Sequence, residues 1–207
     1  MTRTRIPVAP HGFRLPAILL FCLLAATGGC SDKSPVIPAN STLTPGASPD
    51  SMLWNFAAKA LVLHLKAAPD MNFDNGQAHT LKLCMYQLEK LDAFNNLAQS
   101  PDGLARLMEC TRFDPAVRDM NSQIITPGQV ESQTFDRAEG AKHVAVVAGY
   151  SRLEPGLVSR VWSVPAAQYV DGSLFWKTTY YYPGPLEMII LLGPSSLQRY
   201  TEPVGEK

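Results

Sequence analysis

Large apolar side chains recur at every second position in short stretches of this chain, which is the pattern of half-buried β-strands. This period of two predicts a strand in residues 61–66 and another in 81–86. Residues 144–148 are apolar at every position, which favours a central strand covered on both faces. Runs of β-forming residues predict further strands at 122–126, 130–136, 157–164, 174–182 and 186–192. Short strands in this number, separated by turn residues such as Pro183-Gly184-Pro185, predict a mainly β fold, a two-sheet β-sandwich.

One segment, about 91–110, departs from the strand pattern. Its apolar residues have helical spacing, and Ser100-Pro101-Asp102 supplies an N-cap, a first-turn proline and an acidic residue that suits the helix dipole. We therefore expect two short helices there. Cys84 and Tyr86 point away from the apolar face of their own strand, so we also expect these helices to cover that second face.

The first 29 residues have the composition of a signal peptide. Three arginines and no acidic residue precede an apolar run from Ala17 to Ala26, which ends in Thr27-Gly28-Gly29-Cys30. Ten helical residues cover about 15 Å, roughly half of a bilayer core, so a permanent membrane-spanning helix is the weaker interpretation. The chain therefore divides into a signal peptide at 1–29, a linker and a folded body.

Cys30, directly after two small residues, resembles the lipobox cysteine of bacterial lipoproteins. The resemblance implies that Cys30 carries a diacylglycerol and an acylated amino terminus, palmitate being a typical chain, and that Ser31 after it directs the protein to the outer membrane. Several acyl chains hold a protein on a membrane, whereas one does so only reversibly. Thr27 stands where the lipobox usually has Leu, and an ordinary signal peptide with a coincidental Cys is the alternative.

Residues 30–50 form the lipidated Cys and a Pro/Ser-rich tether. The segment 31–50 has four prolines and no aromatic residue, so it favours extended, polyproline-like structure. We expect a single sandwich domain at 51–207.

The charge balance excludes a nucleic-acid-binding protein. The chain has 18 basic and 18 acidic residues, and loss of residues 1–29 leaves 15 basic and 18 acidic residues. A protein that binds nucleic acid normally has a basic excess that displaces counterions from phosphates. The mildly acidic body also makes electrostatic attraction to anionic lipid a poor explanation for membrane attachment, which leaves that task to the acyl chains of Cys30.

Two of the four cysteines remain available for pairing. Cys22 leaves with the leader and Cys30 would carry lipid, so Cys84 and Cys110 form a natural disulfide in an oxidising compartment. The alternative is two buried free thiols.

Residues that would support catalysis are not grouped in this sequence. The histidines at 64, 79 and 143 form no HExxH motif, Gly149-Tyr150-Ser151 lacks the second Gly of a nucleophile elbow, and no Gly-rich phosphate loop occurs. We therefore expect no enzyme and no cofactor.

Nine short motifs, in order and after a lipobox, give residues 54–164 a family likeness. They are Trp54, Ala60-Leu61-Val62-Leu63, Ala68-Pro69-Asp70-Met71-Asn72, Leu83-Cys84-Met85-Tyr86-Gln87-Leu88, Ala93-Phe94 with Leu97, Glu109-Cys110, Phe113-Asp114-Pro115, Pro127-Gly128-Gln129 and Val146-Val147-Ala148-Gly149-Tyr150. The chain resembles the TssJ (VasD/SciN-like) family, outer-membrane lipoproteins of the bacterial type VI secretion system. The resemblance implies a transthyretin-like sandwich with an added helical element, and a structural task. Members of this family tether the periplasmic domain of the inner-membrane subunit TssM, which in turn joins TssL.

The resemblance also implies where TssM binds, in the loop between the first two strands. The matching positions are Asp70, Met71, Asn72, Phe73, Asp74, Asn75, Gly76 and Gln77. On its residues alone, the loop places an exposed Phe and a Met among polar turn formers, a mixture suited to an interface. The alternative is that Phe73 folds back onto the sheet.

A calcium site in the same loop is the weaker interpretation. Asp70, Asn72 and Asp74 alternate as in an EF-hand, but Asn75 stands where the turn Gly is needed and Leu81 where the bidentate Glu is needed. We therefore expect no metal.

An alternative function is that of a periplasmic lipoprotein that binds a small ligand or carbohydrate. Its best support is the aromatic set Phe175, Trp176, Tyr180, Tyr181 and Tyr182. Strand residues packing on a sheet face explain the same set, because aromatic residues are enriched in strands.

Overall fold

The computed structural model describes residues 46–173 and 176–198. The expected signal peptide, the lipobox with Cys30 and the tether up to residue 45 lie outside the described residues, as does Phe175. Within the described residues, no helix has the length and apolar character needed to span a bilayer.

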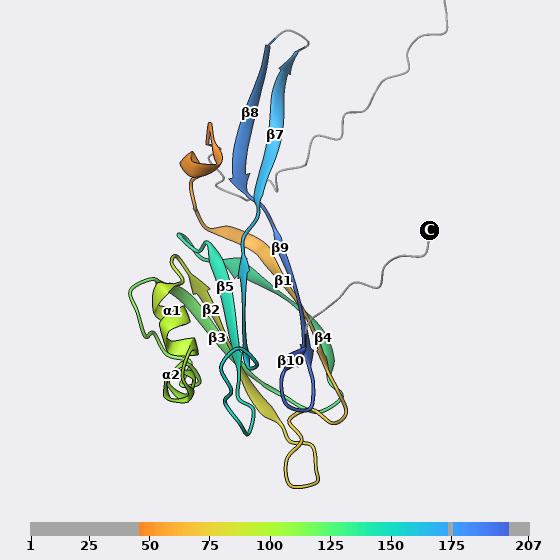
Figure 1. The fold of residues 1–207 in the computed structure, drawn as a ribbon. Coiled ribbons are helices and arrows are strands. Elements are labelled where there is room, and N and C mark those ends of the chain that lie inside the picture. Colours follow the sequence, from red (N-terminus) through yellow and green to blue (C-terminus); the bar gives the residue numbers. More distant parts are fainter. Residues whose placement is uncertain (1–45, 174–175, 199–207) are drawn as a thin grey trace, which may run out of the picture. The chain divides into compact units, whose positions relative to one another are not determined.

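The fold consists mostly of strands (Figure 1). In chain order the elements are η1 Pro49–Ser51, β1 Ala57–Ala67, β2 Leu81–Leu88, α1 Asp92–Ala98, α2 Pro101–Leu107, β3 Val117–Ile125, β4 Val130–Arg137, β5 His143–Ala148, β6 Ser159–Ser163, β7 Ala166–Ser173, β8 Trp176–Pro183, β9 Leu186–Leu192 and β10 Leu197–Gln198.

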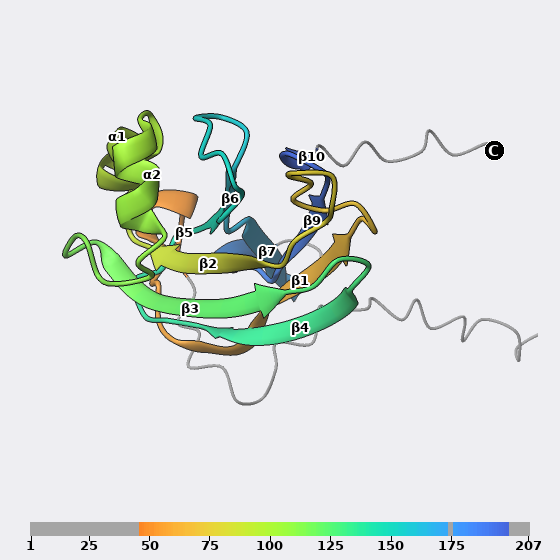
Figure 2. The ribbon, with the colours of Figure 1, turned by 90° about the horizontal axis from the view of Figure 1, so that it is seen from below.

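Two four-stranded sheets make up the sandwich, as the alternating pattern predicts (Figure 2). One has the strand order β10-β9-β1-β4 and the other β3-β2-β5-β6. β1 pairs antiparallel with β4 and parallel with β9, so the beginning and the end of the body lie side by side. Consecutive strands β1 and β2 belong to different sheets, and the loop between them therefore crosses from one sheet to the other.

The core follows the period of two. In β1 the leucines at 61, 63 and 65 are almost fully buried, and they pair in register with Leu186, Met188 and Ile190 of β9. Residues 144–148 of β5 are also buried throughout, as expected of a central strand with both faces covered.

The two short helices cover the outer face of β2. The Ser100 side chain accepts a hydrogen bond from the Gly103 backbone N–H at 3.1 Å, which caps α2. Gly103 also allows α2 to approach α1, because a Cβ there would lie 2.0 Å from the carbonyl oxygen of Leu97. Phe94 of α1 meets the Tyr86 ring edge-on at 6.3 Å between centroids. Both faces of β2 are therefore covered, one by the facing sheet and one by the helices.

The predicted strands differ from the structure at β3, β7 and β10. β3 begins at Val117 instead of 122, because residues 118–122 are all exposed and, apart from Met120, polar, so they carry no apolar alternation. β7 and β10 are not predicted: β7 mixes small and polar residues, and β10 has only two residues. Pro183-Gly184-Pro185 separates two strands, β8 and β9, and these strands pair with different partners, β8 with β7 and β9 with β1.

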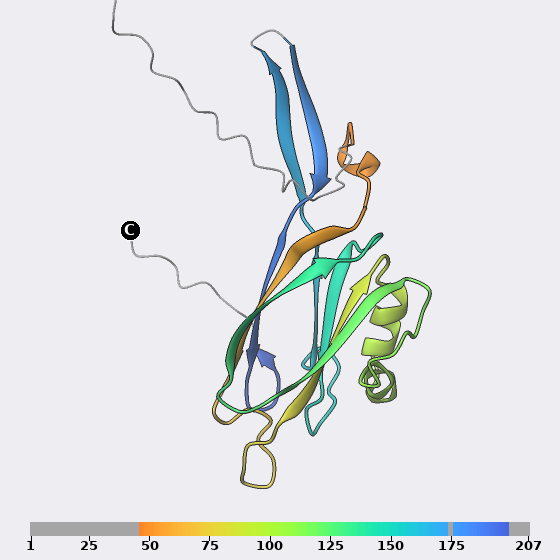
Figure 3. The same cartoon turned by 180° about the vertical axis from the view of Figure 1, so that it is seen from behind.

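Strands β7 and β8 form a separate two-stranded hairpin that projects from one end of the sandwich (Figures 1 and 3). The chain enters the described body beside this hairpin, where Gly46 and Tyr181 exchange two backbone hydrogen bonds of 2.8 and 2.9 Å. Residues 46–50, which the sequence places at the end of the tether, therefore contact the body.

Candidate partner-binding loop

Residues 70–77 connect β1 and β2 at the end of the sandwich opposite the β7–β8 hairpin (Figure 3, yellow loop). Backbone hydrogen bonds hold the loop to the β9–β10 turn, from Asn72 N–H to the Gly193 carbonyl at 3.3 Å and from Phe73 N–H to the Pro194 carbonyl at 2.7 Å. The loop is thus fixed to the β9–β10 turn, although it crosses between sheets.

Two loop residues, Met71 and Asn72, form a buried base. The Asn72 amide donates to the Thr80 carbonyl at 3.2 Å, and its oxygen accepts from the Ser151 N–H at 2.8 Å and the Ser151 hydroxyl at 3.0 Å. Met71 has 0% of its surface exposed, so the expectation that this Met serves as an interface anchor is wrong. Its apolar side chain instead belongs to the core of the sandwich.

Phe73 has the opposite environment. Its side chain is 53% exposed although its backbone is hydrogen-bonded, so the ring does not fold back onto the sheet. An aromatic ring on a fixed backbone loses little conformational freedom when a partner covers it. Phe73 therefore has the properties of an anchor residue in a protein interface.

The tip of the loop is a tight turn. Asp74 and Gln77 exchange backbone hydrogen bonds of 2.9 and 3.1 Å, and between them Asn75 and Gly76 both have positive φ angles, 48° and 82°. Asn-Gly is the pair that a two-residue turn of this kind favours. His79 further closes the loop through its backbone N–H, which donates to the Met71 carbonyl at 3.2 Å.

The loop offers one large apolar side chain among small polar groups. Asp70, Asn75, Gly76 and Gln77 are exposed around Phe73. The Asn72 side-chain oxygen already accepts two hydrogen bonds from Ser151, so it is not available to a cation as the EF-hand-like spacing would require. Among the described residues, no three His, Cys, Asp or Glu side chains are placed to hold a metal ion. The geometry suits recognition of a protein surface.

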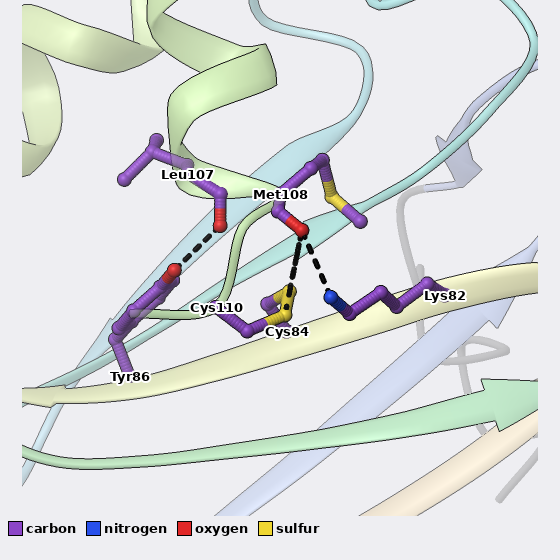
Figure 4. Close-up of a disulfide and its surroundings, with 6 residues drawn as sticks. All are labelled: Lys82, Cys84, Tyr86, Leu107, Met108 and Cys110. Atoms are coloured by element: carbon purple, nitrogen blue, oxygen red, sulfur yellow. Dashed lines mark hydrogen bonds between the residues drawn. A yellow bond between two sulfur atoms is a disulfide. The ribbon is translucent and has the colours of Figure 1, made fainter. Parts of the chain in front are cut away.

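A disulfide joins Cys84 of β2 to Cys110 after α2, with Cα atoms 5.5 Å apart (Figure 4). The Met108 carbonyl beside it accepts a hydrogen bond from Lys82 Nζ at 3.1 Å. Cys110 has a positive φ of 56°, which turns the chain out of the helix toward the sheet. The helical segment is thus fixed to β2 by a covalent bond as well as by packing.

Tyr86 provides a second connection between β2 and α2. Its hydroxyl donates to the carbonyl of Leu107, the last residue of α2 (Figure 4). Burial raises the pKa of Tyr86 to about 12. This hydroxyl therefore stays protonated, and keeps its hydrogen bond, throughout the physiological range.

The histidines link strands. On the outer face of one sheet, His64 Nδ1 contacts the Ser132 hydroxyl at 2.8 Å and His64 Nε2 contacts Glu187 at 2.9 Å. Ser132 of β4 lies directly opposite His64 of β1, whereas Glu187 of β9 lies opposite Val62, two positions before His64 on the same face of β1. These contacts connect three neighbouring strands of the sheet through their side chains. On the other sheet, burial lowers the pKa of His143.

An open groove of about 620 Å³ lies between β6 and β9. It is lined by Leu157, Arg160, Val161, Trp162, Ile189 and neighbouring residues. Tyr180, Tyr181 and Tyr182, cited above for a ligand-binding function, do not line it and belong to the β7–β8 hairpin. Within the described residues, the aromatic set and the groove do not form one site.

Comparisons with known proteins agree on one protein class. The family model described as "Type VI secretion lipoprotein, VasD, EvfM, TssJ, VC_A0113" matches residues 59–182. The fold is similar to the type VI secretion lipoprotein TssJ1 from Pseudomonas aeruginosa, with 21% identity, a TM-score of 0.51, and coverage of 73% of this chain and 98% of that chain.

Two further structures have lower scores. The Serratia marcescens protein Lip, a membrane-bound component of the type VI secretion system, has 19% identity and a TM-score of 0.49, with 69% of this chain and 97% of that chain covered. A chain in a structure described as the TssM C-terminal domain from EAEC has 14% identity and a TM-score of 0.49, with 67% and 94% covered. No curated protein sequence matches the chain.

Proposed function

Because the chain belongs to the TssJ family of type VI secretion lipoproteins, we propose that it is a structural part of a type VI secretion membrane complex. In this proposal Cys30 carries the lipid that anchors the protein in the outer membrane, residues 1–29 are the removed signal peptide, and residues 30–50 span the distance to the body. The body faces the periplasm and tethers the periplasmic domain of TssM, and through it TssL.

The exposed ring of Phe73 on a hydrogen-bonded loop is the observation that carries the TssM-binding part of the proposal. A few aromatic anchors supply most of the binding energy in a typical interface, surrounded by polar residues that exclude water. Phe73, with Asp70 and the Asn75-Gly76-Gln77 tip around it, has this composition. The buried base under the loop limits the entropy that binding would cost.

The position of the loop also supports the proposal. Gly46, where the chain arrives from Cys30, lies beside the hairpin at one end of the body, whereas residues 70–77 lie at the other end (Figures 1 and 3). β1 alone has 11 residues, so the two ends are separated by about 35 Å. A protein anchored near the first end would present the loop away from its membrane.

Co-purification tests this function. Full-length protein is recovered from detergent-solubilised envelopes, either unchanged or with residues 70–77 replaced by a Gly-Ser segment of equal length. We expect TssM to accompany the unchanged protein and to be lost with the replaced loop. Recovery of no large inner-membrane protein with the unchanged chain would refute the proposal.

Fractionation tests the anchor separately. Cys30→Ser removes the thiol that would take the diacylglycerol, so we expect the protein to move from the outer-membrane fraction to the soluble periplasmic fraction. Retention of this variant in the membrane fraction would show that another element holds the protein there.

A further inference from the structure

Within residues 46–173 and 176–198, no second layer covers the β7–β8 hairpin, although a β-ribbon needs one for its apolar face. In this part of the chain the two strands pair with each other, and β8 also forms a bridge with Gly46. At the hairpin's base, Gly184 N–H donates to the Pro165 carbonyl at 2.8 Å and Tyr182 is buried, but exposure increases toward the other end. An isolated two-stranded ribbon is marginally stable in water, so an uncovered one indicates a missing partner.

Aromatic rings occupy one face of this hairpin. Tyr169 stacks on Tyr180 with 5.1 Å between ring centroids and an interplanar angle of 22°, and it lies 6.2 Å from Tyr182. Strand alternation places Trp176 on the same face as Tyr180 and Tyr182. Trp176 is 84% exposed, the highest exposure among the exposed large hydrophobic residues of the described chain.

The backbone near Trp176 is closely packed. Gly172 has a φ of 117°, and a Cβ at this position would lie 1.8 Å from the Trp176 carbonyl oxygen. Only glycine allows β7 to approach β8 so closely there. The exposed indole is therefore carried on a backbone with a defined conformation, and its exposure is a property of the folded hairpin.

The composition of the hairpin is that of a membrane–water interface. Its described residues include one acidic and one basic side chain, Asp171 and Lys177, and five aromatic ones, a tryptophan and three tyrosines on β8 and a fourth tyrosine on β7. The rest are Gln168, Val170, Pro183 and alanine, glycine, serine and threonine residues. Trp and Tyr concentrate at the level of lipid headgroups, where one side of the ring is apolar and the other is hydrated. Because these two charges cancel, contact between the hairpin and a membrane would not depend on electrostatic attraction to anionic lipid.

The short distance along the chain from Cys30 to the hairpin indicates that the partner is the membrane. Gly46, hydrogen-bonded to Tyr181 of the hairpin, follows Cys30 by 16 residues. A chain of that length spans at most about 55 Å. If Cys30 carries lipid, the hairpin stays within this distance of the bilayer at all times, and even weak affinity for lipid is then sufficient for contact.

We propose that the β7–β8 hairpin rests on the membrane that holds the acyl chains of Cys30, with Trp176 at the level of the lipid headgroups. This inference rests on the lipid anchor of the proposed function. The hairpin would give the body a second contact with the membrane. Two contacts fix the orientation of the body relative to the bilayer, whereas the lipid anchor alone only retains it there. In that orientation residues 70–77, at the opposite end, face away from the bilayer.

Fluorescence quenching by brominated lipid tests the contact. Full-length protein is purified from envelopes, its acylation is measured by mass spectrometry, and it is reconstituted into phosphatidylethanolamine–phosphatidylglycerol vesicles with brominated acyl chains. We expect the bromine to quench part of the tryptophan emission, and this part to disappear in Trp176→Phe. As a matched control, Val130→Trp in the Trp176→Phe background places an indole at a position that is 73% exposed at the loop end of β4, and it should remain unquenched.

The possible outcomes distinguish failure of the hairpin–membrane contact from failure of the lipid anchor. If brominated lipid quenches the same fraction of the emission in acylated, vesicle-bound wild type and Trp176→Phe, the hairpin proposal is overturned and the anchor stays intact. Protein without an acyl group refutes the anchor, and the quenching is then measured in excess vesicles, where an unquenched Trp176 also overturns the hairpin proposal. If TssM instead shields Trp176 from aqueous iodide, the hairpin is a protein contact and the lipid proposal is wrong.

Discussion

Removal of the disulfide should lower the free energy of unfolding by an amount that depends on the length of the loop it closes. Cys84 and Cys110 are 26 residues apart, and the chain-entropy model gives about 3.5 kcal/mol for closing a loop of this length. The helices inside the loop keep other contacts, including the Tyr86 hydroxyl on Leu107, so the double variant Cys84→Ala/Cys110→Ala should still fold.

Urea unfolding measures the effect. With a slope of about 2 kcal/mol per molar urea, the expected loss shifts the midpoint by about 1.5–2 M. Reduction of the wild-type protein should reproduce most of that shift, and the double variant should no longer respond to reductant. A thiol reagent that labels both cysteines in the unreduced wild-type protein, or a shift below about 0.3 M, would refute the reasoning.

Two further predictions concern buried polar groups. Asn72→Ala removes three hydrogen bonds that hold the loop to Thr80 and Ser151, and should cost about 2–3 kcal/mol in unfolding while making the loop sensitive to protease; unchanged proteolysis would contradict this. Burial raises the pKa of Tyr86 to about 12 and also raises the pKa of Tyr150. Since both folded-state values exceed the ordinary value of about 10, stability should be complete below about pH 10 and fall as pH increases toward 12. Replacing both with Phe should flatten that decline in urea midpoints measured from pH 8 to 12.

Local pattern predicts those elements whose burial alternates or follows a helical period. β1 and β9 show it most clearly, because each has one face in the core. The helices are predictable from the Ser100 N-cap and apolar spacing. The first part of β3 and the whole of β7 escape prediction. The first part of β3 is exposed on both faces, and β7 lies in a ribbon that no second layer of described residues covers, so burial imposes no alternation on either.

Pairing between strands that are far apart in the sequence cannot be predicted from local pattern. The parallel contact between β1 and β9 joins residues more than a hundred positions apart, and nothing local distinguishes it from a hairpin with β8. In the loop, the sequence places Met71 and Phe73 in equivalent polar surroundings, yet one is buried and the other exposed. The difference arises from the β9–β10 turn, which holds the loop backbone through Gly193 and Pro194, so tertiary context decides which apolar residue is available to a partner.

Binding of TssM by a single exposed ring is the central claim, and the affinity of Phe73→Ala for the purified TssM periplasmic domain tests it most directly. Phe56→Ala is the matched control, since Phe56 has a similar exposed fraction, 47% against 53%, but precedes β1 at the hairpin end of the body. Loss of an anchor of this kind costs about 2 kcal/mol or more, so we expect Phe73→Ala to weaken binding by at least about 30-fold and Phe56→Ala to bind as wild type. Equal affinities for wild type and Phe73→Ala, measured on protein with an unchanged unfolding midpoint, would contradict the account.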